Sequence, residues 1–181
     1  MRHFEQIPTD IEGCFEIQPR VFSDDRGRFV KLFHEDLFLE MGLMGRFEEE
    51  YYSVSPARVL RGLHFQVPPK SHVKLVSCLK GSILDVVYDL RPHSSSSGKV
   101  FSLELSSQKG NMLYVPEGLA HGFYVQSNGA TFLSMNSRKF STECDRGIRW
   151  DSIPFQWPDQ SPVVSEKDRN MIPLEAFENP F

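Results

Sequence analysis

The stretch that decides the fold is residues 59–66, Val-Leu-Arg-Gly-Leu-His-Phe-Gln. Its aliphatic and β-branched start predicts a β-strand, in which alternate side chains share a face. Strict alternation would place His64 on the face of Leu60, Gly62 and Gln66, opposite Arg61 and Leu63. A histidine beside glycine can look into a cavity, because glycine leaves room for a ligand to approach. At this point a histidine buried for structural reasons is the alternative.

Short strands and turns surround this stretch along most of the chain. Strands are predicted at 11–17, 21–22, 28–33, 48–55, 59–66, 72–79, 82–90, 100–105, 112–115, 123–126 and 131–135, and turns or loops at 23–27, 67–71, 80–81 and 92–98. Short helices are predicted at 35–44 and near 166–171. Turn signals every 8–12 residues or so are typical of an all-β sandwich or barrel. After Trp150, frequent prolines predict an irregular C-terminal segment.

Composition narrows the class of protein. The 181 residues predict a single domain, 1–181, and 40% hydrophobic residues with 15 Phe supply a sizeable core. A formal net charge of −4 argues against general nucleic-acid binding. No apolar run predicts a membrane helix or a signal peptide. The cysteines, Cys14, Cys78 and Cys144, form no CxxC pair, so a reducing cytoplasm is expected.

Two histidines in glycine-flanked settings, His64 and His121, raise the question of a metal site. Small barrels of the cupin type bind metal through His-x-His, a following Glu, and a later His after Pro-x-Gly-x-x. Here Pro116-x-Gly118-x-x-His121 is present, but Gln66 stands where the second histidine belongs. Two nitrogens are too few for a transition-metal site, so no metal is predicted.

A histidine and a lysine in a β-cavity suit proton abstraction next to a carbonyl. Neutral His64 can serve as a base near pH 7, and Lys74, one hairpin later, can stabilise an enolate oxygen. Asp85 and Asp89 lie on the next strand, and a jelly roll would bring such positions to one interior. The base also needs an orienting carboxylate, and Asp168 qualifies only if the C-terminal chain folds back.

The chain resembles the RmlC family, the dTDP-4-dehydrorhamnose 3,5-epimerases, from about Gly13 to Asp168. The segments that carry the resemblance, in order, are Asp25-Arg26-Gly27, residues 59–66, Lys74-Leu75-Val76, residues 81–91, Pro116 to Phe123, Gly147-Ile148-Arg149-Trp150 and Ser165-Glu166-Lys167-Asp168. Each is weak alone, but together they are specific for the family. The resemblance implies a cupin-like jelly roll (a double-stranded β-helix), a homodimer, no cofactor, and a nucleotide-diphosphate 4-keto-6-deoxyhexose as substrate.

The resemblance also implies roles for individual residues. His64 would be the base, Asp168 would orient it, and Lys74 would sit by the C4 oxygen. Arg61 and Arg26 would face the diphosphate, with Arg26 reaching across the dimer, and His121 would line the sugar pocket with Asp85 behind it. The other positions that the family pattern places at the substrate are Phe29, Glu49, Tyr51, Gln66, Ser134 and Lys167.

The chain departs from the family pattern at three of these positions. In the full 3,5-epimerases a tyrosine thirteen residues after the His121 position serves as the acid on the opposite face. Here that position is Ser134, whose hydroxyl is far less acidic than a phenol. Glu49 and Tyr51 stand where the family usually has Gln and Asn. We therefore favour inversion at C3 alone, with water or Tyr51 as the acid, and inversion at both C3 and C5 is the alternative. The expected substrate is a dTDP- or CDP-linked sugar of deoxysugar or polysaccharide biosynthesis, and the altered pocket also leaves a GDP-linked sugar open.

Two other functions remain open from the sequence. The same base could serve a tautomerase that moves the ketone along the ring. The chain could also be a sugar-binding jelly roll that has lost activity, which the missing tyrosine suggests. The presence of His64, Lys74 and Asp168 together favours an enzyme, since binding alone needs no oriented base.

Overall fold

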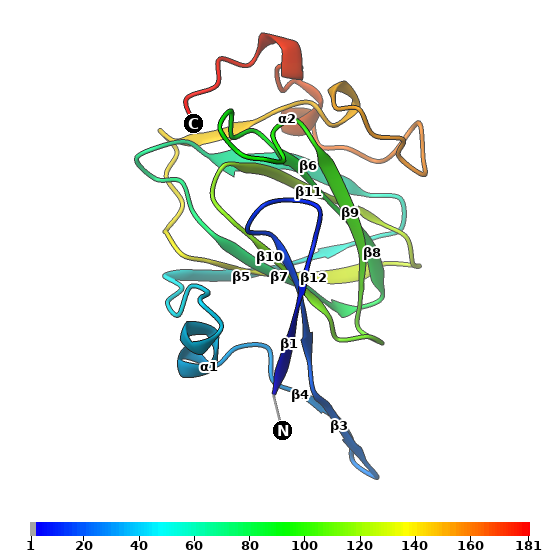
Figure 1. The fold of residues 1–181 in the computed structure, drawn as a ribbon. Coiled ribbons are helices and arrows are strands. Elements are labelled where there is room, and N and C mark those ends of the chain that lie inside the picture. Colours follow the sequence, from blue (N-terminus) through cyan, green and yellow to red (C-terminus); the bar gives the residue numbers. More distant parts are fainter. Residues whose placement is uncertain (1–2) are drawn as a thin grey trace.

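The computed structural model describes residues 3–181, which form mostly antiparallel β-structure (Figure 1). The strands are β1 (Phe4–Pro8), β2 (Phe15–Pro19), β3 (Val21–Asp24), β4 (Gly27–Val30), β5 (Glu49–Ser55), β6 (Leu60–Gln66), β7 (Lys74–Lys80), β8 (Ser82–Asp89), β9 (Val100–Ser106), β10 (Met112–Val115), β11 (Leu119–Val125), β12 (Ala130–Asn136) and β13 (Asp145–Gly147). The helices are α1 (Glu35–Glu40) and α2 (Glu166–Arg169), with short 3-10 helices at Trp150–Ser152 and Leu174–Ala176.

The strands form two large sheets that face each other. One sheet has the order β1-β2-β10-β7-β12-β5 and the other has the order β13-β6-β11-β8-β9. From β5 onward the chain passes repeatedly from one sheet to the other, so neighbours within a sheet are distant in sequence. This crossing pattern confirms the predicted jelly roll. A separate hairpin of β3 and β4 projects away from the two sheets (Figure 1).

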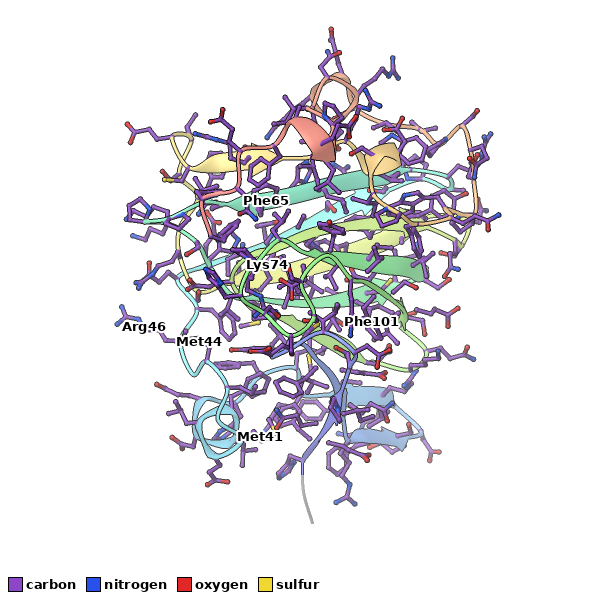
Figure 2. All side chains as sticks on the ribbon, turned by 45° about the horizontal axis from the view of Figure 1, so that its top comes forward. Met41, Met44, Arg46, Phe65, Lys74 and Phe101 are labelled. Atoms are coloured by element: carbon purple, nitrogen blue, oxygen red, sulfur yellow. The ribbon has the colours of Figure 1, made fainter. Side chains whose placement is uncertain are left out.

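Apolar side chains pack in three clusters, one inside the barrel and one on the outer face of each sheet. The inner cluster includes Val76, Val87 and Phe132. The outer face of the five-stranded sheet lies under the C-terminal segment, where Phe65 packs edge-on against Phe177 with ring centroids 5.2 Å apart. On the outer face of the other sheet, side chains of β1, β2, β7 and β10 pack against α1 and the residues that flank it. Figure 2 shows Lys74 within the barrel and Phe65 on the side of the C-terminal segment.

The predicted alternation along residues 59–66 is wrong after Arg61. His64 pairs with His121 and Arg61 with Phe123, so three steps on β6 match two on β11. This β-bulge inserts one residue and shifts the alternation by one position. Leu60, Leu63 and Phe65 therefore share the outer cluster, whereas Arg61 and His64 both line the interior.

Gly62 also has a different role from the predicted one. Its φ is +134°, and a Cβ built there would lie 2.6 Å from the Cα of Gly122. A Cβ on Gly122 would meet the Arg61 carbonyl oxygen at 2.7 Å. The missing side chains therefore let β6 and β11 approach each other, rather than making room for a ligand.

Several predicted boundaries move because of local turns. The strand predicted at 11–17 begins at Phe15, because residues 11–14 form a turn in which the Cys14 amide donates to the Ile11 carbonyl over 3.0 Å. The helix predicted at 35–44 ends at Glu40, where Gly42 with φ +73° closes it. β11 begins at Leu119, four residues before the predicted strand.

Two strands, β1 and β13, lay outside the predicted set. Neither has a clear alternation of its own, and each forms by pairing with a stronger neighbour, β1 with β2 and β13 with β6. The described helices are short, and none between residues 3 and 181 has the length and apolarity to cross a membrane.

Candidate active site

The polar part of the barrel interior is built from strands of both sheets. Successive residues of a strand face opposite sides, so an inward row arises from every second position. The inward polar side chains are Glu49, Tyr51 and Ser53 on β5, Arg61, His64 and Gln66 on β6, Lys74 on β7, Asp85 on β8, His121 on β11, and Ser134 and Asn136 on β12. Every catalytic or binding residue that the sequence predicts on these strands therefore faces one interior, whereas Asp89 at the end of β8 lines neither cavity there.

The C-terminal chain does fold back, and it brings Asp168 to His64. Val163 pairs with Val59 in a parallel bridge, which lays the segment beside the start of β6. Ser165 then caps α2, its hydroxyl accepting a 3.0 Å hydrogen bond from the Asp168 amide. His64 Nε2 lies 2.7 Å from Asp168 Oδ1. The predicted contact between His64 and Asp168 is thus present.

Asp168 is a buried carboxylate with two N–H partners. Its Oδ2 accepts from the Gly62 amide at 3.2 Å, while Oδ1 faces His64. Burial alone would raise the pKa of Asp168, but the hydrogen bond and charge of His64 and the Gly62 amide lower that pKa below its usual range. Asp168 is therefore ionised at neutral pH and holds the Nε2 proton of His64, which leaves Nδ1 as the basic nitrogen.

Lys74 stands beside His64 in the interior. Its side chain is buried, and Nζ donates to the His64 carbonyl oxygen over 3.3 Å. Burial lowers the pKa of Lys74 to about 8, a fall that the charges of Asp85 and Asp145 limit. At neutral pH Lys74 is thus mostly an ammonium ion in a place that water reaches poorly, where it can stabilise an oxyanion strongly.

His121 and Asp85 form a second buried pair. His121 Nε2 lies 3.0 and 2.9 Å from the two Asp85 oxygens, and its ring stacks on Phe132. The sequence predicts Asp89 in the same interior as Asp85, and this prediction is wrong. It accepts hydrogen bonds from Arg91, Ser94 and Ser96 and lines neither cavity that contains His64.

Two cavities meet at His64, Lys74 and Tyr51. The inner one, of about 210 Å³, is lined by Tyr51, Ser53, Arg61, His64, Lys74, His121, Gly122, Phe123 and Phe132. The outer one, of about 470 Å³, is lined by Glu49, Glu50, Tyr51, His64, Phe65, Gln66, His72, Lys74, Asn136, Phe140, Asp145 and Lys167. The three shared side chains therefore mark the junction where a substrate that fills both cavities would be held.

Three predicted binding residues at this junction form a connected set. Ser134 lies directly opposite Tyr51 in the β5–β12 register, and Asn136 lies opposite Glu49. Ser134 Oγ donates to Asn136 Oδ1 over 3.0 Å, and Asn136 Nδ2 donates to Glu49 Oε2 over 3.4 Å. Burial raises the pKa of Tyr51, and side-chain hydrogen bonds from Ser134 and Asn136 offset part of that rise.

Other predicted residues lie at the edge of the site or outside it. Lys167 lines the outer cavity and pairs with Asp145 at 2.6 Å. Gln66 also lines it, but its amide already binds the Lys70 carbonyl and the Ser141 amide. Arg26 and Phe29 are not brought to the site within one chain, since both lie on the β3–β4 hairpin, with the Arg26 side chain 89% exposed.

The structure adds residues that the sequence reasoning missed, namely Ser53, His72, Asn136, Phe140 and Asp145. Ser53 and Asn136 could have been found, because each lies two positions from a predicted residue on the same strand face. Among the described residues, Ser53 Oγ is the one buried side-chain polar atom without a hydrogen-bond partner, and it lines the inner cavity. A substrate hydroxyl there would satisfy it.

Comparisons with known proteins show the family to which this chain is similar. A family model for dTDP-4-dehydrorhamnose 3,5-epimerase matches residues 8–176. The dTDP-4-dehydrorhamnose 3,5-epimerase of Shigella flexneri is 40% identical over 167 residues, covering 91% of this chain and 92% of that protein. A dTDP-4-dehydrorhamnose 3-epimerase of Streptomyces niveus is 33% identical over 170 residues, covering 92% of this chain and 82% of that protein.

A solved structure shows the same architecture. The crystal structure of dTDP-6-deoxy-D-glucose-3,5-epimerase RmlC from Legionella pneumophila, in complex with dTDP-4-keto-L-rhamnose, matches with a TM-score of 0.92 and 32% identity. The match covers 97% of this chain and 95% of that one. The likeness confirms the predicted cupin-like form of the jelly roll.

Proposed function

This chain belongs to the dTDP-4-dehydrorhamnose 3,5-epimerase family, and from that premise we propose that it inverts C3 of a nucleotide-diphosphate 4-keto-6-deoxyhexose. The observation that carries the proposal is the 2.7 Å contact of His64 with Asp168 at the junction of two cavities, beside the Lys74 ammonium. An isomerase of this kind needs an oriented base next to a ketone and a cation at the ketone oxygen.

The reaction begins with a proton transfer to His64. The C3 hydrogen is acidified by the adjacent C4 ketone, and Nδ1 of His64 has no hydrogen-bond partner within residues 3–181. As Nδ1 takes the proton, the Asp168 carboxylate stabilises the imidazolium through Nε2. The electrons of the C–H bond move into an enolate, whose oxygen the Lys74 ammonium stabilises.

An exchange experiment in D₂O tests this function. The protein is incubated with dTDP-4-keto-6-deoxyglucose and, in parallel, with its CDP-linked analogue, and products are followed by NMR. Deuterium and inversion at C3 alone support the proposal, whereas equal labelling at C3 and C5 identifies a 3,5-epimerase. A ketone that moves along the ring identifies a tautomerase. Absence of exchange with either sugar would leave the binding-protein alternative.

The pH dependence should report the charge on Lys74. Its pKa is lowered to about 8, so the ammonium is present below that pH and is lost as pH rises through it. We expect kcat/KM of the wild type to fall above about pH 8. In Lys74→Arg the cation stays charged, because arginine does not titrate in proteins, so the smaller remaining activity should not fall over this range.

Initial rates from about pH 6 to 9.5 with both proteins test this assignment. Thermal unfolding at each pH separates loss of catalysis from loss of structure. A wild-type profile that stays flat through pH 8, or an equal fall in Lys74→Arg, would contradict it.

We also infer a homodimer in which the β3–β4 hairpin serves the partner's site. β5 is an edge strand of its sheet, yet its outward side chains Tyr52 and Val54 are 68% and 67% exposed. Phe29 on the projecting hairpin is 61% exposed. Exposed edges with apolar side chains favour association, and a second copy of the same chain would bury both surfaces. Arg26 would then reach the diphosphate of the substrate in the partner.

A complementation experiment tests the shared site. Arg26→Ala and His64→Asn homodimers should both be nearly inactive at substrate concentrations below KM, because each site lacks one contributor. Mixed dimers contain one site with both groups intact, so refolding the two variants together should restore activity. A monomer by light scattering, or a mixture no more active than its parts, would contradict a shared site.

We further expect the protein in a reducing compartment such as the cytoplasm. The cysteines Cys14, Cys78 and Cys144 are all unpaired and buried. Unpaired cysteines are ordinary where thiols are kept reduced.

A further inference from the structure

The two walls of the cavity carry different proton-transfer groups. His64 lies on β6 of the five-stranded sheet, and Tyr51 lies on β5 of the six-stranded sheet. Both line the inner and the outer cavity. A sugar ring held between the two sheets would therefore present one face to the His64 imidazole and the other to the Tyr51 phenol.

The residues around Tyr51 leave room for its ring at the cavity wall. Across the β5–β12 pair it lies opposite Ser134, a small side chain that is fully buried and leaves room for the ring. Tyr51 is 46% exposed because its ring lines an open cavity, while its hydroxyl lies by Ser134 and Asn136. A second large aromatic side chain at position 134 would compete with Tyr51 for that space.

Burial raises the pKa of Tyr51, so the phenol carries a proton to deliver at neutral pH. Ser134 and Asn136 interact with the phenol in the way that lowers its pKa, which means that they stabilise a phenolate. Asn136 is in turn held by Glu49. Asn136 has a second amide hydrogen for the negative charge of a phenolate, and the Ser134 hydroxyl, which donates to Asn136 Oδ1 before the step, can turn its hydrogen to the phenolate as well.

We propose that Tyr51 is the acid that returns a proton to the sugar ring from the face opposite His64, in place of an acid at position 134. This assignment rests on the proposed epimerase function. Tyr51 and Ser134 are two of the positions at which this chain departs from the family pattern, and the two residues lie opposite each other. Together they move the phenol from β12 to the neighbouring strand β5.

The proton balance of the step is complete. His64 Nδ1 removes the C3 proton, and the C–H electron pair forms the enolate. The enolate carbon then takes the Tyr51 hydroxyl proton from the other side, the C4 ketone reforms and C3 is inverted. The imidazolium gives its proton to water and the phenolate takes one from water, which the open outer cavity admits.

Tyr51→Phe separates removal of the proton from its return. His64 can still remove the C3 proton and give back a deuteron on the same face, so recovered substrate should take up deuterium in D₂O at close to the wild-type rate. Formation of the inverted product should fall by about 10²- to 10³-fold, the usual effect of losing a general acid. Ser134→Ala keeps the phenol but removes a donor to the phenolate, so a smaller fall in epimerisation is expected, again without loss of exchange.

Tyr88→Phe is the matched control, because Tyr88 on β8 packs against the outer cluster of the five-stranded sheet and lines neither cavity, and its rates should equal those of the wild type. Epimerisation by Tyr51→Phe at the wild-type rate would overturn the assignment. An equal fall in exchange and epimerisation would also overturn it, since Tyr51 would then act in binding or folding. If the wild type itself neither exchanges nor inverts a ketosugar, the proposed function fails instead.

Discussion

Replacing His64 with asparagine is expected to stop both deuterium uptake at C3 and formation of the inverted product. Asparagine has similar size and polarity but no basic nitrogen, so the C3 proton has no acceptor at the junction of the two cavities. The loss in kcat should be at least about 10⁴-fold, the upper end for a base that is indispensable to the step. Rates of exchange and of product formation in D₂O measure the two events separately.

His93→Asn provides the control for this variant, because His93 is exposed on the loop between β8 and β9 and lines neither cavity. It should keep wild-type rates. Substrate binding by His64→Asn, measured by calorimetry with the dTDP-linked ketosugar, should be nearly unchanged. Residual turnover close to that of the wild type would mean that another group removes the proton, and the proposed mechanism would be wrong.

Replacing Asp168 with asparagine should reduce kcat by about 10³- to 10⁴-fold, as loss of the orienting carboxylate does in other histidine-based enzymes. Asp168 accepts from both the Gly62 amide and His64 Nε2, at 3.2 and 2.7 Å. An amide offers one oxygen, so it can serve only one of these donors. If the oxygen keeps Gly62, the NH₂ group faces Nε2 and forces the proton to Nδ1, the nitrogen that must accept the substrate proton.

Nitrogen NMR of labelled histidine reports this change directly. In the wild type the proton of His64 should reside on Nε2, and in Asp168→Asn it should move to Nδ1. Asp151→Asn, a surface change at a residue paired with Arg149, should alter neither the tautomer nor kcat. An Asp168→Asn variant with unchanged kcat would show that His64 needs no orienting carboxylate.

The sequence predicted much of the site because strand alternation is a local property. His64, Lys74 and Asp85 could each be assigned to a strand from short-range patterns, whereas His121 lies just before the strand predicted at 123–126. The placement of Asp85 behind His121 came from the resemblance to the family. The resemblance to the family added Asp168, whose contact with His64 joins positions 104 apart. No local pattern could predict that contact, since it depends on how the C-terminal segment lies along β6.

The sequence-based predictions were wrong where a single inserted residue shifted the alternation of a strand, and where a segment became a strand only by pairing with an adjacent strand. The bulge between Arg61 and His64 reversed the predicted faces, and it becomes visible only in the pairing of β6 with β11. The local sequence predicts room for a ligand at Gly62, but the backbone of Gly122 on β11 occupies that room. Strands β1 and β13 form because stronger strands offer them hydrogen bonds.

By itself the sequence determined the strand-rich fold and the family and pointed to His64 as the candidate base, because turn residues, alternation and the segments around His64 are properties of short stretches of chain. Only the tertiary structure decided which groups share the cavity: it brought Asp168 to His64, placed Tyr51 over Ser134 and left Arg26 on a projecting hairpin. The reason is physical. Side-chain direction along a strand follows from backbone geometry, whereas contact between distant segments follows from how two sheets and a C-terminal segment pack together.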